Sequence, residues 1–405
     1  MFRDRGLASI RRADNGILLL DTGLVPLTNR IVRVRVRENG RIVGRSKVPS
    51  NSDVESAEGR ILQARDSIFE EELFYELVRE ARVMASQGVT TRQNEVQISV
   101  AGERDILLDL VDVEEEDDAE PVSDYQDILA EGLSHLIHIL LSYSHRQNLR
   151  RRMQIPPPLT PKKKQIPEYQ LLRPTMAYLQ HSSHVQWLQS FLADIYGVLN
   201  SAGLNCEYST ALFSSARPPQ EGTFSTPRAE SLIEQLLQPL ETTATSKLIV
   251  PNSKLMTKIH TNLTGPPFGT NYEFSVNLAS FHDIKPTSRI GLRDDLSAII
   301  THMILLDIVS AISISSNNSQ QHPLKWEAVY PHHGELLASS PTADTIKKMK
   351  ITVSRDMLKL QTHYVRGTGN YGPQESWQGA EESFTWGGAE SEKSSFMDIV
   401  AQVSN

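Results

Sequence analysis

The chain has 405 residues, of which 39% are hydrophobic, so it can bury a sizeable core and form roughly two or three domains. Its formal net charge of -8 at pH 7 excludes a general attraction to nucleic-acid phosphates or anionic lipid, although local basic patches could still bind them. The single cysteine, Cys206, excludes an intramolecular disulfide and fits a reducing, intracellular compartment.

No N-terminal secretory signal and no membrane segment are expected. The charged start, MFRDRGLASIRR, lacks the apolar core that a secretory signal needs. The most apolar stretch, residues 298–314, contains His302 and Asp307 and is shorter than the roughly 20 residues that a membrane span needs. We therefore expect a buried core helix there and no membrane partner.

The first clear element is a β-hairpin over residues 31–45. Valine and arginine alternate along IVRVRVR, and Asn39-Gly40 supplies the positive φ angles that a tight turn needs. The alternation buries the valines and places a row of basic side chains on the other face: Arg33, Arg35 and Arg37. This row could bind phosphate or an acidic protein segment, or be the solvated face of a two-faced sheet.

A helix is predicted from Ser67 to Gly88. Ser67 and Glu70 match an S-x-x-E capping box, and the acidic run EEE lies in the first turn, where the helix dipole favours negative charge. Its apolar positions cover roughly half the circumference, which is wider than a one-sided stripe. Either its own domain covers both sides or one side meets another chain. The candidates for that partner interface are Phe69, Leu73, Phe74, Leu77 and Val78.

Two more strands are predicted within residues 95–113, followed by a long amphipathic helix over residues 124–152. On this helix Glu131, His135 and His138 have the spacing i, i+4 and i+7 and could present three ligands to a metal ion. The spacing is not that of a zinc helix, so we favour a solvated face and predict no metal and no other cofactor.

Residues 153–173 form a basic, proline-rich linker between an N-terminal hairpin and helical unit, residues 1–152, and a second domain, residues 174–365. Its flanking basic clusters resemble a bipartite nuclear-localisation signal: Arg150, Arg151, Arg152, Lys162, Lys163 and Lys164. Such clusters also occur without a targeting role, so localisation by this signal is a hypothesis.

The second domain is predicted to combine helices with antiparallel sheet, which makes the fold class α+β. Helices are expected over residues 174–201, 227–240 and 292–314. Strands are expected at residues 205–214, 247–252, 254–265, 271–280, 324–331, 334–339 and 347–355, and whether the last one continues towards residue 365 is left open. The tail, residues 366–405, is expected to be mostly disordered, except for the apolar segment SSFMDIVAQVS.

Catalytic motifs are missing from the sequence. GTGNYG, residues 367–372, matches G-x-G-x-x-G, but Pro373 and a polar tail follow where a dinucleotide-binding fold needs a helix. The three consecutive glutamates point about 100° apart on a helix and cannot converge on one substrate atom, so capping explains them better than catalysis. We therefore predict no enzyme.

The run ILQARDSIFEEELFYELVREARVMASQGVTTR, with the preceding DRGLASIRRADNGILLLDTGL and the strand ILLDLVD, resembles fungal-type subunit 17 of the Mediator complex. The likeness extends loosely to about residue 365, and the tail after Arg366 is not matched. The resemblance implies a nuclear, non-catalytic scaffold of the Mediator head module. It also implies other head subunits as partners and a role in connecting activators to RNA polymerase II.

Members of that family carry a long, largely helical N-terminal region ahead of the matched part. The resemblance therefore implies that this chain corresponds to their C-terminal α/β part, in the fixed jaw of the head, and that it could be a truncated form. The alternative function is a nucleic-acid-binding module that uses Arg33, Arg35 and Arg37 together with the basic linker.

Overall fold

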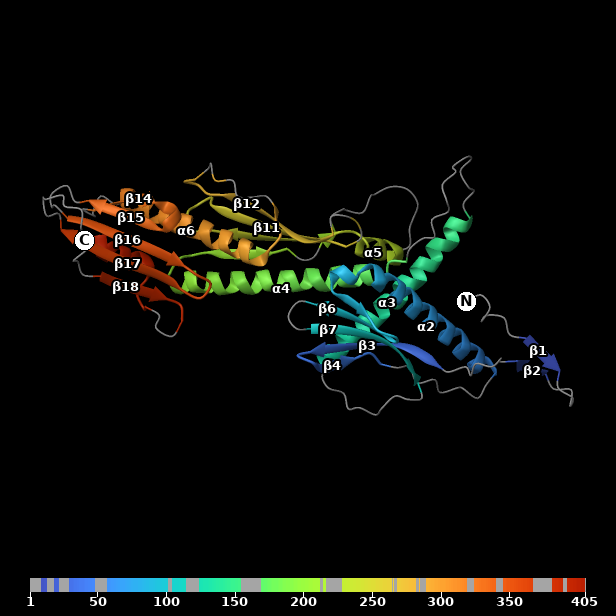
Figure 1. Ribbon diagram of the computed structural model, residues 1–405. Coiled ribbons are helices and arrows are strands. Elements are labelled where there is room, and N and C mark those ends of the chain that lie inside the picture. Colours follow the sequence, from blue (N-terminus) through green and yellow to red (C-terminus); the bar gives the residue numbers. More distant parts are fainter. Residues whose placement is uncertain are drawn as a thin grey trace. The chain divides into compact units, whose positions relative to one another are not determined.

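The computed structural model shows two compact units, and Figure 1 labels their helices and strands. It describes residues 9–12, 18–21, 29–47, 57–100, 104–113, 124–153, 169–211, 214–215, 228–263, 265, 268–281, 284, 289–318, 324–339, 345–366, 381–388 and 392–404. Unit 1 comprises Met1–Gln180, Arg217–Gln238 and Leu263–Pro267, and unit 2 comprises His181–Ala216, Pro239–Asn262 and Phe268–Asn405.

Unit 1 is built on an antiparallel sheet with the strand order β4-β3-β7-β6-β5. Its strands are β3 (Arg30–Glu38), β4 (Arg41–Arg45), β5 (Val89–Thr91), β6 (Glu95–Val100) and β7 (Arg104–Asp112). The predicted hairpin is confirmed, because β3 and β4 pair across Asn39 and Gly40, whose φ angles are 51° and 78°. A separate pair joins β1 (Ser9–Arg12) to β2 (Leu18–Asp21).

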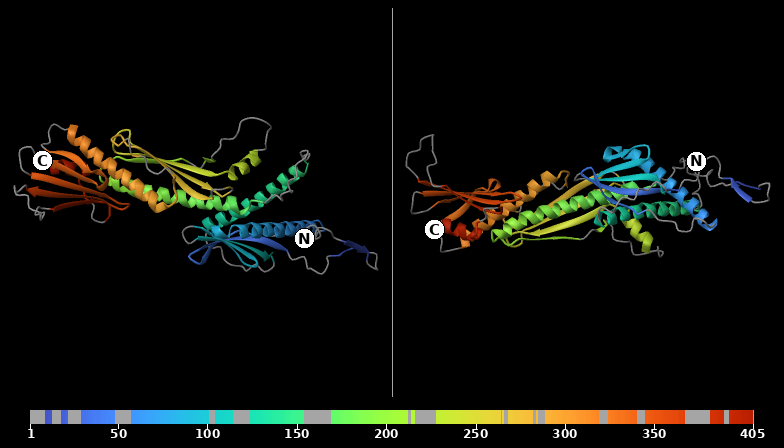
Figure 2. Two further views of the ribbon diagram at one scale, coloured as in Figure 1. Left: turned by 45° about the horizontal axis from the view of Figure 1, so that its top comes forward. Right: turned by 90° about the horizontal axis from the view of Figure 1, so that it is seen from below.

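Two long helices, α2 (Ala57–Val83) and α3 (Asp124–Met153), pack against this sheet (Figure 2). The valines of β3 are buried in the core, as the alternation predicted, and so are Leu73, Leu77 and Ala81 of α2. Gly44 allows α3 to approach β4 closely, because an added Cβ would lie 2.5 Å from the backbone of Gln126. The short helix η1 (Ala85–Gln87) follows α2.

The predicted start of α2 is wrong. The helix begins at Ala57, so Ser67 lies inside it and is not a helix cap. Ser67 is buried, and its Oγ donates a hydrogen bond to Asn29 Oδ1 at 3.2 Å. The S-x-x-E pattern gave the wrong start because the Ser67 hydroxyl bonds to a residue far away in the sequence, which a local pattern cannot show.

Unit 2 contains two antiparallel sheets, ordered β13-β12-β11-β10-β8, with β9 also on β10, and β14-β15-β16-β17-β18. The first has β8 (Glu207–Thr210), β9 (Ser214–Ser215), β10 (Leu240–Lys247), β11 (Lys254–Asn262), β12 (Gly269–Asn277) and β13 (Arg289–Ile290). The second has β14 (Lys325–Tyr330), β15 (Glu335–Ser339), β16 (Thr345–Val353), β17 (Leu358–Arg366) and β18 (Glu381–Trp386).

The remaining helices are α4 (Leu172–Ser201), α5 (Arg228–Leu236), α6 (Arg293–Asn318), η3 (Pro331–His333) and α7 (Phe396–Ser404). In the described part of the chain, α6 has the length and hydropathy of a membrane span, but half of its most apolar window is buried inside the protein. It packs on β14 and β16, which is the position expected of a core helix.

The α+β fold class is confirmed. Two local predictions for unit 2 need correction, one at residues 247–252 and one in the tail. The strand predicted at residues 247–252 is wrong, because β10 occupies residues 240–247 and a turn follows it. Its sequence LETTATSK alternates buried and less buried positions but is rich in threonine, so its apolar signal is weak. The apolar residues Leu248 and Val250 are buried within the turn itself.

The tail differs from expectation in part. Residues 381–386, expected to be disordered, form β18 and pair with β17, while the apolar segment forms α7 as expected. Trp386 and Phe396 are fully buried, with ring centroids 5.2 Å apart. Tryptophan among glycine and serine gives little periodic signal, which is why the strand was missed. GTGNYG, residues 367–372, lies outside the described residues.

Replacing Trp386 with alanine tests whether the tail belongs to the core of unit 2. The cavity left by the indole should lower the free energy of unfolding by about 3–5 kcal/mol, measured by chemical denaturation. Met357→Ala is the matched control, because Met357 is exposed and its loss should change stability by less than about 0.5 kcal/mol. Equal effects of the two variants would show that the tail does not stabilise unit 2.

Candidate functional site

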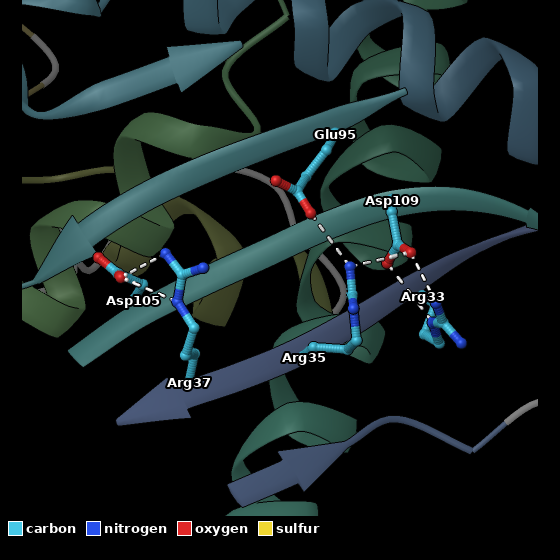
Figure 3. A network of polar contacts seen from close by, with 6 residues as sticks. All are labelled: Arg33, Arg35, Arg37, Glu95, Asp105 and Asp109. Carbon is cyan, nitrogen blue, oxygen red and sulfur yellow. Dashed lines mark hydrogen bonds and ion pairs between the residues drawn. The ribbon is translucent and has the colours of Figure 1, made fainter. Parts of the chain in front are cut away.

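The arginine row predicted on β3 lies on one face of the unit 1 sheet, opposite a row of acids (Figure 3). The register of β3 and β7 sets Arg33 across from Asp109 and Arg37 across from Asp105. Arg35 lies across from Leu107, and so its guanidinium reaches diagonally to Asp109 on β7 and to Glu95, the neighbour of Asp109 on β6.

Each arginine of the row is paired. Arg33 Nη2 is 2.7 Å from Asp109 Oδ2, and Arg37 Nη2 is 2.7 Å from Asp105 Oδ2. Arg35 Nη2 bridges Glu95 Oε2 at 3.1 Å and Asp109 Oδ2 at 3.2 Å. Burial opposes ionisation of Asp105, but hydrogen bonds, above all from Arg37, outweigh it and hold the pKa of that carboxyl below its usual value.

This pairing removes the basis for phosphate binding. The positive charges of Arg33, Arg35 and Arg37 are balanced by Glu95, Asp105 and Asp109. Leu107 is nevertheless buried on this outer face, as expected where long arginine stems cover apolar surface. A phosphate would have to displace carboxylates that already sit on the guanidiniums, and no observation favours the nucleic-acid alternative.

The first acid of the EEE run has a structural role that the sequence did not indicate. Glu70 is buried, and its Oε2 accepts a hydrogen bond from the Val32 backbone N–H at 2.9 Å. The pairing of β4 with β3 starts only at Arg35, so Glu70 completes the hydrogen bonding of β3 beyond the end of β4. Capping and dipole compensation therefore do not explain this residue.

Glu70 also binds α3, through His138. Its Oε1 is 2.6 Å from His138 Nε2, while His138 Nδ1 donates to the Ser134 carbonyl at 2.6 Å. The solvated face expected for Glu131, His135 and His138 is thus correct only for His135, whose side chain is largely exposed. Burial opposes the charged imidazole, but the hydrogen bond and the charge of Glu70 raise the pKa of His138 above its usual value.

Other helix carboxylates of unit 1 bind backbone groups in the same way. Asp127 and Glu131 on α3 accept the N–H groups of Arg45 and Lys47, each at 2.8 Å, along the outer edge of the sheet. Glu80 on α2 accepts three N–H groups at the start of α4, at distances of 2.7, 2.7 and 3.2 Å. Burial raises the pKa of Glu80, although these hydrogen bonds act against the rise.

The predicted partner-interface residues lie in different surroundings. Leu73, Phe74 and Leu77 are buried in unit 1, where α2 meets the sheet. Phe69 and Val78 are half-buried, and the ring of Phe69 contacts two histidines of α3, with centroid distances of 6.1 and 6.2 Å. The wide apolar surface is therefore used largely within this chain, and a partner role stays a prediction for Phe69 and Val78.

The candidate localisation signal is only partly described. Arg150 is at the end of α3 and pairs with Glu230 at 2.9 Å, whereas Arg151 and Arg152 are exposed there. Lys162, Lys163 and Lys164 lie outside the described residues.

Unit 2 has a hollow of about 420 Å³ whose lining includes Trp187, Phe191, His302 and Arg355. Two of its polar groups are engaged elsewhere: Arg355 Nε donates to Asp194 Oδ2 at 2.8 Å, and His302 is 3.0 Å from His332. Burial raises the pKa of the Cys206 thiol to about 12, which disfavours a reactive thiolate. Within the described ranges, no group of three or more histidine, cysteine or acidic residues is placed to hold a metal ion.

Comparison with known proteins gives matches over the whole chain. Residues 1–198 match the family model described as subunit 17 of the Mediator complex. Over 100% of this chain, the identity is 49% to a protein of Aspergillus oryzae and 51% to one of Neosartorya fischeri, both named Mediator of RNA polymerase II transcription subunit 17. The relative of that name from Coccidioides immitis is 35% identical over 96% of this chain. The chain spans about 65% of the length of the Aspergillus and Neosartorya relatives and 64% of the Coccidioides one.

A solved structure supports the fold. A chain in the structure of the Schizosaccharomyces pombe Mediator head module matches with a TM-score of 0.50 and 14% sequence identity. The match covers 73% of this chain and 64% of that chain. At this identity the likeness shows the shared fold alone.

Removing the acid shared by two arginines tests the ion-pair row. Asp109→Ala should lower the free energy of unfolding by about 2–3 kcal/mol, because Arg33 and Arg35 lose a common, largely buried carboxylate. The control is Asp66→Ala, since the Arg65–Asp66 pair is exposed and should contribute less than about 0.5 kcal/mol. A cost at Asp109 no larger than that at Asp66 would contradict a structural role for the row.

The Glu70–His138 pair predicts a pH dependence of stability. Because the pKa of His138 is raised in the folded chain, its contribution is fully present below its unfolded pKa, about 6.5, and is lost as the pH rises through the folded pKa. His138→Gln should therefore cost about 1–2 kcal/mol more at about pH 6 than at about pH 9, measured by urea denaturation. The control is His135→Gln, because the His135 side chain is 70% exposed and its 3.4 Å contact with Glu131 should contribute less than about 0.5 kcal/mol. A pH-independent cost at His138 would contradict the charged pair.

Proposed function

We propose that this chain is a member of the family of subunit 17 of the Mediator complex and a non-catalytic structural subunit of the Mediator head module. In this role it is part of a coactivator that links transcription regulators to RNA polymerase II. The observation that carries the proposal is the identity of 49–51% over the whole chain to proteins named as that subunit.

The chemistry of unit 1 supports a structural role. The carboxylates of Glu70, Glu80 and Asp127 are occupied by backbone N–H groups of this chain, and a residue so engaged is poorly placed to act on a substrate. The arginine row is likewise neutralised by acids of the same sheet. These groups fix the fold, which is what an assembly subunit requires of them.

The partners that follow from this proposal are other subunits of the Mediator head and, directly or through them, the RNA polymerase II machinery. The location that follows is the nucleus. No small-molecule substrate and no direct binding of nucleic acid are part of the proposal. The half-buried pair Phe69 and Val78 stays a candidate for contact with a neighbouring subunit.

Affinity purification tests the proposal. The chain, tagged and expressed in fungal cells, should co-purify with a set of Mediator head subunits in stoichiometric amounts, identified by mass spectrometry. A fluorescent fusion of the same chain should accumulate in the nucleus. A tagged chain of unrelated sequence and similar charge is the control for non-specific capture. Recovery of the chain alone, or a cytoplasmic fusion, would contradict the proposal.

A further inference from the structure

One face of α3 stays open to solvent although the rest of the helix is packed in unit 1. From residue 126 to residue 149, every exposed position of α3 lies on this face, and the other positions are buried or half-buried. We call this face, extended by Met153 in the last turn of the helix, the α3 seam. It consists of Ile128, Gly132, His135, Ile139, Ser142, Arg146, Leu149 and Met153.

The spacing of the seam alternates between steps of four and three residues without interruption. A helix has about 3.6 residues per turn, so a repeat of this kind, averaging about 3.5, keeps one narrow row of side chains in line. It is the a and d pattern by which one helix packs along another in a coiled coil. The row extends over roughly 37 Å, at about 1.5 Å per residue.

Half of the seam is apolar and strongly exposed. Ile128 is 70% exposed, Ile139 49%, Leu149 58% and Met153 74%. Isolated exposed apolar residues are ordinary on a protein surface, but four of them on one face of a single helix, with small or polar residues between them, indicate a contact surface. Gly132, between the first two, has open space around it, and an added Cβ would meet nothing within 4 Å.

We propose that the α3 seam binds an amphipathic α-helix of a partner protein, packed along α3 as in a two-stranded coiled coil. The proposal deepens the scaffold function and rests on it for the kind of partner, a neighbouring subunit of the same complex. The two helices cross at about 20°, with apolar residues of the partner helix between those of the seam.

The geometry favours a helix over other occupants. Between residues 126 and 149 the seam is one residue wide, with buried or half-buried positions on both sides, and exposed arginines flank its end, so a lipid surface, which needs a broad apolar face, does not fit. A β-strand needs unpaired backbone groups at a sheet edge, which the interior of a helix does not offer. A facing helix with the same 4-3 repeat meets each apolar residue of the row.

Charge indicates the polar residues of the partner. Beside the end of the seam, Arg146 Nε and Arg150 Nη1 share one carboxylate, Glu230, at 2.8 and 2.9 Å. Two guanidiniums and one carboxylate leave a net positive charge next to Leu149 and Met153. The partner helix therefore carries aspartate or glutamate beside its apolar row at this end, where it pairs with Arg146 or Arg150.

Site-specific photo-crosslinking on the full chain within the purified complex tests the seam directly. A benzophenone amino acid at Ile139 or Leu149 should crosslink to one subunit, in a segment with apolar residues at alternating steps of three and four and an acid nearby. The same probe at Ile61 or Val83 is the control, since these residues of α2 are 69% and 65% exposed but lie off the seam. They should not crosslink to that segment.

Binding measurements then use a peptide of the crosslinked segment. Ile139→Glu with Leu149→Glu should weaken its binding by about 100-fold or more, because two apolar contacts are lost. Ile61→Glu with Val83→Glu should change it by less than about threefold. All four side chains are exposed, so the variants are expected to fold, and circular dichroism verifies this. Arg146→Glu should weaken binding, and replacing the facing acid of the peptide with lysine should restore it.

The outcomes separate this proposal from the scaffold function. The seam proposal alone would be overturned if the seam crosslinked to a second copy of this chain or to a segment without the 4-3 repeat. It would also be overturned if the seam crosslinked to no co-purified subunit. Equal binding by the seam and control variants would do the same. A wild-type chain that recovers no Mediator subunit would instead overturn the scaffold function and, with it, the choice of partner.

Discussion

Unit 1 depends on a buried carboxylate. Glu70 holds the end of β3 through the Val32 N–H and holds α3 through His138, so one side chain joins a strand and two helices. A buried carboxylate is costly without hydrogen-bond partners, and removing either partner leaves an unsatisfied polar group. The positions of α2, α3 and β3 are thus coupled: moving any one of them breaks a short polar contact as well as apolar packing.

Buried carboxylates that accept hydrogen bonds from backbone N–H groups also occur elsewhere in the chain. In unit 2, Asp307 of α6 is buried and accepts the N–H groups of Ile249 and Val250, at 2.8 and 3.1 Å. Glu80 does the same for the first turn of α4. Each acid satisfies backbone groups that no strand or helix partner can reach. Glu70, Glu80 and Asp307 are therefore part of the structural framework.

Local sequence patterns predicted much of the fold. Contacts between residues far apart in the sequence could not be predicted from such patterns. The Val/Arg alternation and Asn39-Gly40 specified the β3–β4 hairpin, because both signals act within a few residues. The acids that neutralise Arg33 and Arg37 lie 76 and 68 residues away, so the sequence showed a basic row where the structure has a balanced one. Glu70 and Val32 are likewise separated by 38 residues, and a local capping pattern was the only signal available.

An amphipathic helix face can bind a partner only where its own unit leaves that face exposed. The wide apolar pattern on α2 is mostly used by its own unit: Leu73 and Leu77 have no exposed surface. The α3 seam is less apolar, since glycine, serine, histidine and arginine alternate with its large residues, and a hydrophobicity count passes over it. A subunit that folds before it assembles buries its widest apolar face in its own core. The narrower, partly polar row that remains exposed is the one suited to a specific partner helix, because polar positions in such a row fix register and orientation.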